Sequence, residues 1–495
     1  MTKPIKSLLA AAVVALATTT GAAYAAKMDV TLGIRLEPPH LDPTAHAAGA
    51  VDWVVYANVF EGLTRIDRNG GVKAALAESW TISDDGKVYT FNLRKGVKFH
   101  DGADMTAADV VFSYDRARGK DSVNAQKALF AAIDMVEAVD PATVKVTLKN
   151  PQGNFLFNMG WGDAVIVSSK SADGNKTNPV GTGPFKFSKW IKGDSVILVK
   201  NPNYWGTPAK LDKATYKIIA DPAAAMSAIL AGDVDGFPIF PAPENLNQLK
   251  SDPRFSVVVG STEGETILST NNTKPPFNDV RVRRAIAHAI NRQSIIDGAM
   301  FGYGTPIGSH FAPHHPAYVD LTGKYPHDPA KAKALLAEAG HPDGFKATLK
   351  LPPPSYARRG GEIIAADLRK VGIELEIIPV EWGQWLKEVF KATDYDLTIV
   401  SHTEPMDIGI YARDKYYFNY SNDAYKAVIK ELSITADPAK RTDLMKKAQM
   451  ILSDDAVNGY LFQLAKAGVW NAKLKGLWEN MPTQSLDLTE VYWED

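Results

Sequence analysis

The chain contains no cysteine among its 495 residues. Disulfides, thiolate metal ligands and cysteine nucleophiles are therefore all excluded. An excess of either charge is also absent, because 55 Lys and Arg stand against 56 Asp and Glu, for a formal net charge of −1. Such a balance provides no overall field for nucleic acid or for an anionic membrane surface. We therefore expect no nucleic-acid partner.

Long apolar runs are missing after the first 25 residues, so no later segment is expected to span a membrane. The amino terminus has Lys3 and Lys6, then an apolar run over 8–17, then Ala23-Tyr24-Ala25. A basic region, a short apolar run and a small-x-small site in this order are typical of a secretory signal peptide, although a buried amino-terminal helix is the alternative. We expect residues 1–25 to be the signal peptide, cleaved after Ala25. Without a lipobox cysteine, the product should be free in a bacterial periplasm.

Signatures of common enzyme classes are missing as well. The sequence has no Gly-x-Ser-x-Gly, no Walker A and no His-Glu-x-x-His pattern. The glycine-rich segment 179–184 is not a phosphate loop, because Pro184 blocks the helix start that such a site needs. We therefore expect a protein that is not an enzyme and that uses no cofactor.

The sequence predicts local structure most clearly over residues 77–116. Alternation around Trp80 predicts a strand, the Asp-Asp-Gly-Lys segment 84–87 predicts a hairpin turn, and 88–93 alternates as the second strand. Thr106 is typical of a helix N-cap, with Asp109 in a capping-box position.

Elsewhere the pattern predicts a mixed α/β chain. It predicts a strand over 28–36 and a helix over 53–62. The end of the chain reads as a series of short strands. Alternating strands and helices of this kind are typical of a mixed sheet.

The segments 93–102 and 106–113 together resemble the signature of the family 5 extracellular solute-binding proteins. These are the peptide, dipeptide and oligopeptide receptors of bacterial ABC importers. Segments 178–187 and 275–286 resemble two further parts of the same family. The resemblance covers essentially the whole mature chain.

This resemblance implies an α/β, bilobal periplasmic-binding-protein fold of the type II, three-domain peptide-binding class, with mixed sheets and a hinge. Domain I would combine 26–60, 179–262 and 470–495, domain II would be an insertion at 61–178, and domain III would span 263–469. The implied function is capture of a short peptide or a related amine-bearing solute, which a monomer would deliver to an ABC permease in the inner membrane.

The resemblance also points to the loop at 401–407. In peptide-binding relatives, an aspartate before proline at this place pairs with the α-ammonium of the ligand. Glu404 keeps the carboxylate but is longer by one methylene, and Asp407 is a second candidate. A buried carboxylate needs a positive partner to offset its desolvation. The alternative is a carboxylate paired inside the protein, for example with Arg413.

Other candidates come from strand ends and aromatic side chains. Glu37 follows the first strand at the end where open sheets place ligands, unless it is only a solvated loop residue. Tryptophans near loops can form pocket walls or fill the core, and a tyrosine-rich segment spans 411–420. The expected ligand-binding residues are Glu37, Trp161, Trp382, Trp385, His402, Glu404, Asp407, Tyr411 and Arg413.

Three positions depart from the dipeptide-binding pattern. Leu351 and Pro353 stand where relatives have an arginine and a tyrosine, and His402 stands where a tryptophan is usual. The ligand is therefore expected to be a different short peptide or an amine-bearing molecule such as an amino-acid derivative or opine.

Three alternatives stay open. The closely spaced His310, His314 and His315 suggest a metal-chelate receptor on the same fold as one alternative. Their spacing matches no standard ligand pattern, so we assign no metal ligand. Glu404 and Asp407 as an acid–base pair would make a secreted peptide or saccharide hydrolase. A chaperone-like or signalling receptor is the third alternative.

Overall fold

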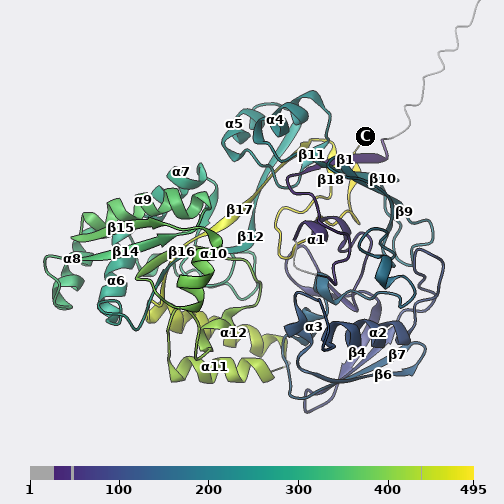
Figure 1. The fold of residues 1–495 in the computed structure, drawn as a ribbon, viewed down its shortest axis with the longest axis horizontal. Coiled ribbons are helices and arrows are strands. Elements are labelled where there is room, and N and C mark those ends of the chain that lie inside the picture. The colour runs from purple at the N-terminus through teal and green to yellow at the C-terminus, as the bar shows by residue number, and fades with distance from the viewer. Residues whose placement is uncertain (1–26, 46–48, 436, 495) are drawn as a thin grey trace, which may run out of the picture.

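The structure is a computed structural model that describes residues 27–45, 49–435 and 437–494. Two bodies lie side by side and are joined by the strands β12 (Phe255–Thr270) and β17 (Asn458–Asn471) (Figure 1). The expected signal peptide and its cleavage after Ala25 lie outside the described residues. Within the described ranges, no helix is long and apolar enough to cross a membrane.

One sheet of eleven strands runs through both bodies. Its ladder is mixed, because β1 pairs with β10 and β14 pairs with β15 and β16 in parallel, whereas β12 and β17 run antiparallel. In spatial order the strands are β15 (Ile373–Pro379), β14 (Phe345–Leu351), β16 (Leu397–His402), β12, β17, β11 (Gly236–Phe237), β1 (Asp29–Ile34), β10 (Lys213–Ile218), β9 (Ser195–Lys200) and β8 (Phe185–Ile191), while β13 (Gly304–Pro306) pairs separately with β17.

The two connecting strands are longer than the sequence suggests. β12 has 16 residues and β17 has 14, which corresponds to a span of roughly 50 Å for β12 at about 3.3 Å per residue. The expectation of only short strands at the end of the chain is therefore wrong for β17. Between Ser261 and Glu265 the register of β12 on β17 shifts, so the ladder is interrupted within the pair of strands that joins the bodies.

The first body contains the amino-terminal strand and helix. Helix α1 spans Gly49–Val55 and is mostly buried, rather than covering 53–62 as expected. The chain leaves the helix because Ala57 has a left-handed backbone, with φ of 63°, which a continuing α-helix does not allow. The other helices here are α4 (Pro222–Ala231) and α5 (Leu246–Lys250), and the short strands β18 (Leu474–Lys475) and β19 (Tyr492–Trp493) pair with each other.

The segment that lies between these parts in sequence has a sheet and a core of its own. The sheet order is β4 (Ala77–Ile82), β5 (Val88–Leu93), β7 (Thr143–Leu148) and β6 (Ile133–Asp140), with α2 (Ala107–Arg118), α3 (Phe155–Asn158) and the pair β2 (Thr64–Ile66) and β3 (Val72–Ala74) beside it. The predicted hairpin is confirmed, and so is the capping box, in which the Thr106 backbone N–H donates to Asp109 Oδ2 at 2.9 Å. The domain boundaries themselves stay a prediction.

The second body packs helices around β14, β15 and β16, with an apolar core between them. Its helices are α6 (Val280–Ala289), α7 (Arg292–Met300), α8 (Pro329–Glu338), α9 (Ser355–Arg369), α10 (Trp382–Trp385) with a π-helical turn η6 (Leu386–Lys391), α11 (Asp423–Ile434) and α12 (Pro438–Asp454).

Short 3₁₀ turns occur along the whole described chain. They are η1 (Lys127–Phe130), η2 (Gly162–Ala164), η3 (Ala172–Gly174), η4 (Pro243–Asn245), η5 (Thr322–Lys324) and η7 (Ile408–Ala412).

The two bodies also touch away from β12 and β17. The loop before α3 meets α11 and α12 at the lower edge of Figure 1. The Gly153 backbone N–H donates to the Ser433 carbonyl at 2.8 Å, and the Arg441 guanidinium donates to Asn154 Oδ1. We call this the lower contact.

Candidate functional site

A cavity of about 630 Å³ lies between the two bodies. One wall comes from residues 126–161 and the other from residues 382–417, so residues far apart in sequence form it together. This volume is in the usual range for small-molecule sites. The lining residues from the first wall are Gln126, Ala128, Leu129, Asn154, Phe157, Asn158 and Trp161.

Most of the expected ligand-binding residues meet at this cavity. Those that line it are Trp161, Trp382, Trp385, His402, Glu404, Asp407 and Arg413. Together they come from the segment after α3, from α10, from the end of β16, from the loop that leads into η7 and from the residue that follows η7.

Glu37 and Tyr411 do not line the cavity. The Glu37 carboxylate accepts hydrogen bonds from Trp190 Nε1 and the Gly193 backbone N–H, both at 3.0 Å, so it closes a turn in the first body. Tyr411 is buried, and its hydroxyl accepts a hydrogen bond from Asn458 Nδ2 at 3.2 Å. It supports the cavity from behind.

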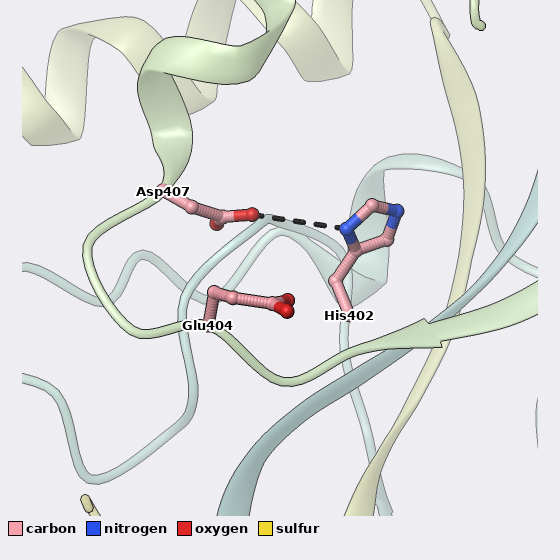
Figure 2. A group of neighbouring side chains, drawn as sticks. All are labelled: His402, Glu404 and Asp407. Carbon is pink, nitrogen blue, oxygen red and sulfur yellow. Dashed lines mark ion pairs between the residues drawn. The ribbon is translucent and has the colours of Figure 1, made fainter. Parts of the chain in front are cut away.

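The loop after β16 places two carboxylates at the cavity. Met406 has φ of 64°, a left-handed conformation that is uncommon outside glycine and that turns the chain between Glu404 and Asp407. Figure 2 shows the side chains of both residues directed toward the same space as His402. Strained backbone of this kind is typical of functional loops.

Glu404 is the unpaired carboxylate of this loop. Its side chain is exposed, and its only hydrogen bond among the described residues comes from the adjacent Thr403 backbone N–H, at 3.2 Å. Arg413 also lines the cavity and is exposed, with its guanidinium 5.4 Å from the Tyr416 ring centroid. In the described part of the chain, neither Glu404 nor Arg413 forms an ion pair.

Asp407, in contrast, is paired inside the protein. His310 Nε2 lies 2.8 Å from Asp407 Oδ1, and His402 Nδ1 lies 3.7 Å from Asp407 Oδ2. Burial alone would raise the pKa of Asp407, but the two imidazoles, His310 first, outweigh burial and hold the pKa well below its usual range. The alternative of an internally paired carboxylate therefore holds for Asp407, with His310 rather than Arg413 as its partner.

His310 connects the loop to the strand that joins the two bodies. Its Nδ1 lies 2.8 Å from Glu265 Oε1, so the ring sits between two carboxylates. Burial lowers the pKa of His310, but Glu265 and Asp407 overcome this effect and raise the pKa to about 10. Burial also raises the pKa of Glu265, against the influence of His310. Glu265 pairs in register with His402, next to the interruption in the β12 ladder.

His402 is held from its other side. Its Nε2 is hydrogen-bonded to the Tyr417 hydroxyl at 2.8 Å, and the two rings are nearly parallel, 4° apart in plane. Burial alone would lower the pKa of His402. The nearby carboxylates, Asp407 first, outweigh burial and raise the pKa above its usual value. His402 therefore presents Nδ1 to the cavity in a fixed orientation.

Aromatic rings form much of the rest of the wall. Trp382 is 41% exposed, whereas Trp385 is 4% exposed and donates from Nε1 to Thr398 Oγ1 at 2.9 Å. Trp385 is thus mainly a core residue with an edge at the cavity. This agrees with the alternative that such a tryptophan fills the core. Phe157 and Trp161 meet edge to face on the opposite wall.

The histidine loop does not form a cluster. His310 takes the bridging position described above, His314 lies 2.6 Å from Glu263, and His315 stacks on Phe311. The three rings therefore have different partners and do not converge on one point. Their closeness in sequence gives no support to the metal-chelate alternative. Sequence reasoning missed the pairing of His310 with Asp407, because nothing local connects residues about a hundred positions apart.

A smaller cavity of about 330 Å³ adjoins the first. The two share Gln126, Trp161, Thr403 and Glu404. Its lining includes Asp52 and Asp163. Burial raises the pKa of Asp163 to about 7, and burial together with the Asp163 charge raises the pKa of Asp52. The two cavities therefore meet at Glu404, and the smaller one carries two further carboxyl groups.

Comparison with known proteins decides the family. Residues 71–423 match the model of bacterial extracellular solute-binding proteins, family 5 Middle. The chain belongs to this family. It is a family of solute-binding proteins rather than enzymes, which answers the hydrolase alternative.

Individual relatives agree with this assignment. The chain is 36% identical over 375 residues to the glutathione-binding protein GsiB of Salmonella choleraesuis, covering 74% of this chain and 72% of that protein. Among solved structures, the periplasmic binding protein DppA from Helicobacter pylori in complex with the peptide STSA overlaps with a TM-score of 0.76 at 29% identity, over 95% of this chain and 99% of that one. HbpA2 from Haemophilus parasuis overlaps with a TM-score of 0.87 at 26% identity, over 94% and 100%. The mixed α/β fold expected from the sequence is confirmed.

Proposed function

We propose that this protein is the periplasmic receptor of an ABC importer and that it captures a short peptide or peptide-like solute with a free amino group. Glu404 carries the proposal. It is a carboxylate at the cavity that has no ion pair among the described residues, so a ligand ammonium can supply its partner. Asp407, whose charge is already matched by His310, has the role of shaping the loop.

The other end of the ligand has a partner in Arg413. Its guanidinium is exposed at the same cavity and forms no ion pair within the described ranges. A ligand with an amino group and a carboxylate, as a peptide or glutathione has, would use Glu404 and Arg413 together. The tryptophan walls would cover the chain between them, and the smaller cavity leaves room for an extended side chain.

The name of one relative suggests which ligand to test first. GsiB is a glutathione-binding protein by name, and DppA binds the peptide STSA. Glutathione and short peptides share a free amine, at least one carboxylate and a peptide backbone. An ABC permease in the inner membrane is the partner that the family implies.

Isothermal titration calorimetry of the ligand-free protein tests the proposal. We expect one molecule of glutathione, or of a di- or tripeptide such as Ala-Ala or Ala-Ala-Ala, to bind per protein. The N-acetylated form of the same compound should bind at least about tenfold more weakly, because it has lost the ammonium that pairs with Glu404. Equal affinity for the free and acetylated forms would contradict the assignment of Glu404.

A matched pair of variants locates the amine. Glu404→Gln should weaken binding of the free amine about tenfold or more and leave the acetylated form unaffected. Glu362→Gln removes an exposed carboxylate on α9, away from the cavity, and should change neither affinity. Absence of binding by any amine-bearing peptide or glutathione would overturn the proposed ligand class.

A further inference from the structure

We propose that Asp52 and Asp163, which line the smaller cavity, bind a second positive charge on the solute. The receptor then favours short peptides whose first residue is lysine, ornithine or arginine. This inference rests on the proposed function in one respect, because the amino group held by Glu404 decides where the side chain of the first residue starts.

The smaller cavity adjoins the proposed position of the ligand amine. Glu404 and Trp161 line both cavities, whereas Asp52 and Asp163 line only the smaller one. A side chain on the carbon that carries an ammonium at Glu404 can therefore enter the smaller cavity. The volume of about 330 Å³ is enough for one long side chain, since cavities of this size hold small ligands.

The two carboxyl groups come from different elements and are brought together at a glycine. Asp52 is in the first turn of α1, and Asp163 is in η2, directly after Gly162. A methyl group added at Gly162 would lie 2.8 Å from Asp52 Oδ1, so the Asp52 carboxylate packs against the backbone that carries Asp163. Glycine at this position therefore allows both acidic side chains to line one cavity.

Neither carboxyl group has a positive partner in the described part of the chain. Asp52 Oδ1 is buried without a hydrogen-bond partner there, and Asp163 is 7% exposed and forms no ion pair with a described residue. Only neutral donors, from the backbone and from Trp161, favour the charged form of Asp163. A buried carboxylate without a cation is costly, and a cation on the ligand would remove that cost.

The charge around the smaller cavity has one sign. The titratable residues in its described lining are Asp52, Asp163 and Glu404, and all three are acidic. Burial raises the pKa of Asp163 to about 7, and burial together with the Asp163 charge raises the pKa of Asp52. Tyr56 also acts on Asp52, but burial raises the pKa of Tyr56, so that its hydroxyl stays neutral. The empty pair therefore retains protons near neutral pH, and a bound ammonium would displace them.

Calorimetry with a matched pair of dipeptides tests the subsite. Lys-Ala differs from Nle-Ala, which has norleucine in place of lysine, only by the ammonium group of the side chain. We expect the parent to bind Lys-Ala at least about tenfold more tightly than Nle-Ala at pH 8. In Asp163→Asn, and separately in Asp52→Asn, this ratio should fall to about two or less. Asp173→Asn removes an exposed carboxylate of the same body and should keep the ratio of the parent.

Proton release gives a readout that a purely structural pair of aspartates would not show. Binding heats at pH 7 in two buffers of different ionisation enthalpy should show that Lys-Ala releases more protons than Nle-Ala. The α-amino group is common to both peptides, so its own titration cancels in this comparison. The preference for Lys-Ala should also increase from pH 6 to pH 8, as the two carboxyl groups ionise. A preference below about twofold in the parent, or one that survives both Asn variants, would overturn the subsite.

Failure of the subsite is distinguishable from failure of the proposed function. Binding of Ala-Ala that depends on Glu404, together with equal affinities for Lys-Ala and Nle-Ala, would overturn the subsite and leave the proposed function standing. A preference for Lys-Ala that depends on Asp163, with Nα-acetyl-Lys-Ala binding as tightly as Lys-Ala, would overturn the role of Glu404 and leave the two aspartates as a cation site.

Discussion

At the scale of single residues, the bridging imidazole of His310 holds the binding loop in place. It faces the buried Glu265 carboxylate on one side and the partly buried Asp407 carboxylate on the other. Removing one partner from a buried ionic group leaves a charge without compensation, which costs about 3–5 kcal/mol. We therefore predict that His310→Gln lowers the free energy of unfolding by about that amount in urea denaturation of the ligand-free protein. His327→Gln, at an exposed site, should stay within about 0.5 kcal/mol of the parent; similar losses in both variants would contradict the bridging role.

A second residue-scale prediction concerns pH. His100 Nδ1 accepts from the Gly181 backbone N–H at 3.3 Å, and Nε2 is bonded to the Gly183 carbonyl at 2.9 Å, so the folded protein holds the neutral ring. Burial lowers the pKa of His100 to about 4; the backbone bond to Gly183 and the charge of Asp101 oppose this, while Lys186 adds to it.

The sign follows from this direction. Below about pH 6.5 the unfolded chain protonates His100 while the folded protein does not, so stability is full above pH 6.5 and is lost as pH falls toward 4. The difference in unfolding free energy between the parent and His100→Gln should therefore shrink over this window, by up to about 3 kcal/mol. A difference that stays constant between pH 7 and pH 4 would contradict it.

Sequence alone predicted part of the cavity lining at this scale. Glu404 and Asp407 could be placed there because the resemblance fixes a loop position. The pairing of Asp407 could not be predicted, because its partner His310 comes from a different loop. Glu37 was misplaced for the same reason, since its partner Trp190 comes from another strand.

At the scale of elements, local signals were reliable and non-local ones were not. The hairpin at 84–87 and the capping box at Thr106 are confirmed, because each is determined by residues a few positions apart. The length of β17 was missed, because its 14 residues are specified by pairing with β12, about two hundred positions earlier. The alternation of residues within one strand does not predict how far that strand stays paired with another.

The lower contact provides a prediction for elements. A methyl group added at Gly153 would lie 1.6 Å from Arg441 Nη1 and 2.4 Å from the Thr435 carbonyl, so α12 and the loop before α3 would have to separate. We predict that Gly153→Ala weakens binding of the ligand by about 1–3 kcal/mol although it touches no ligand, because closure of the two bodies is opposed by overpacking.

Gly174→Ala is the matched control, at another glycine of the same body. A methyl group added there meets nothing within 4 Å, and its affinity for ligand should equal that of the parent. Calorimetry of both variants measures the effect. Equal affinities would contradict the prediction and would mean that the lower contact does not have to tighten when the bodies close.

At the scale of the whole molecule, the two bodies and their connection imply motion. β12 and β17 join the bodies, their ladder is interrupted between Ser261 and Glu265, and the cavity lies between the bodies. Closure of two rigid bodies about the segments that connect them is a common response to ligand. We infer that the arrangement described here closes further on ligand.

Small-angle scattering measures this closure directly. A compact chain of this length has a radius of gyration of about 23 Å, and a protein with its two bodies apart has a larger one. Saturation with the peptide or glutathione that binds by calorimetry should bring the radius of gyration down toward that value, because closure expels water and buries the ligand between Glu404 and the opposite wall. The N-acetylated compound at equal concentration is the control and should lower the radius of gyration less, in proportion to its lower occupancy. A radius that does not change when calorimetry shows full occupancy would mean that the cavity is preformed, and the connection through β12 and β17 would then be rigid.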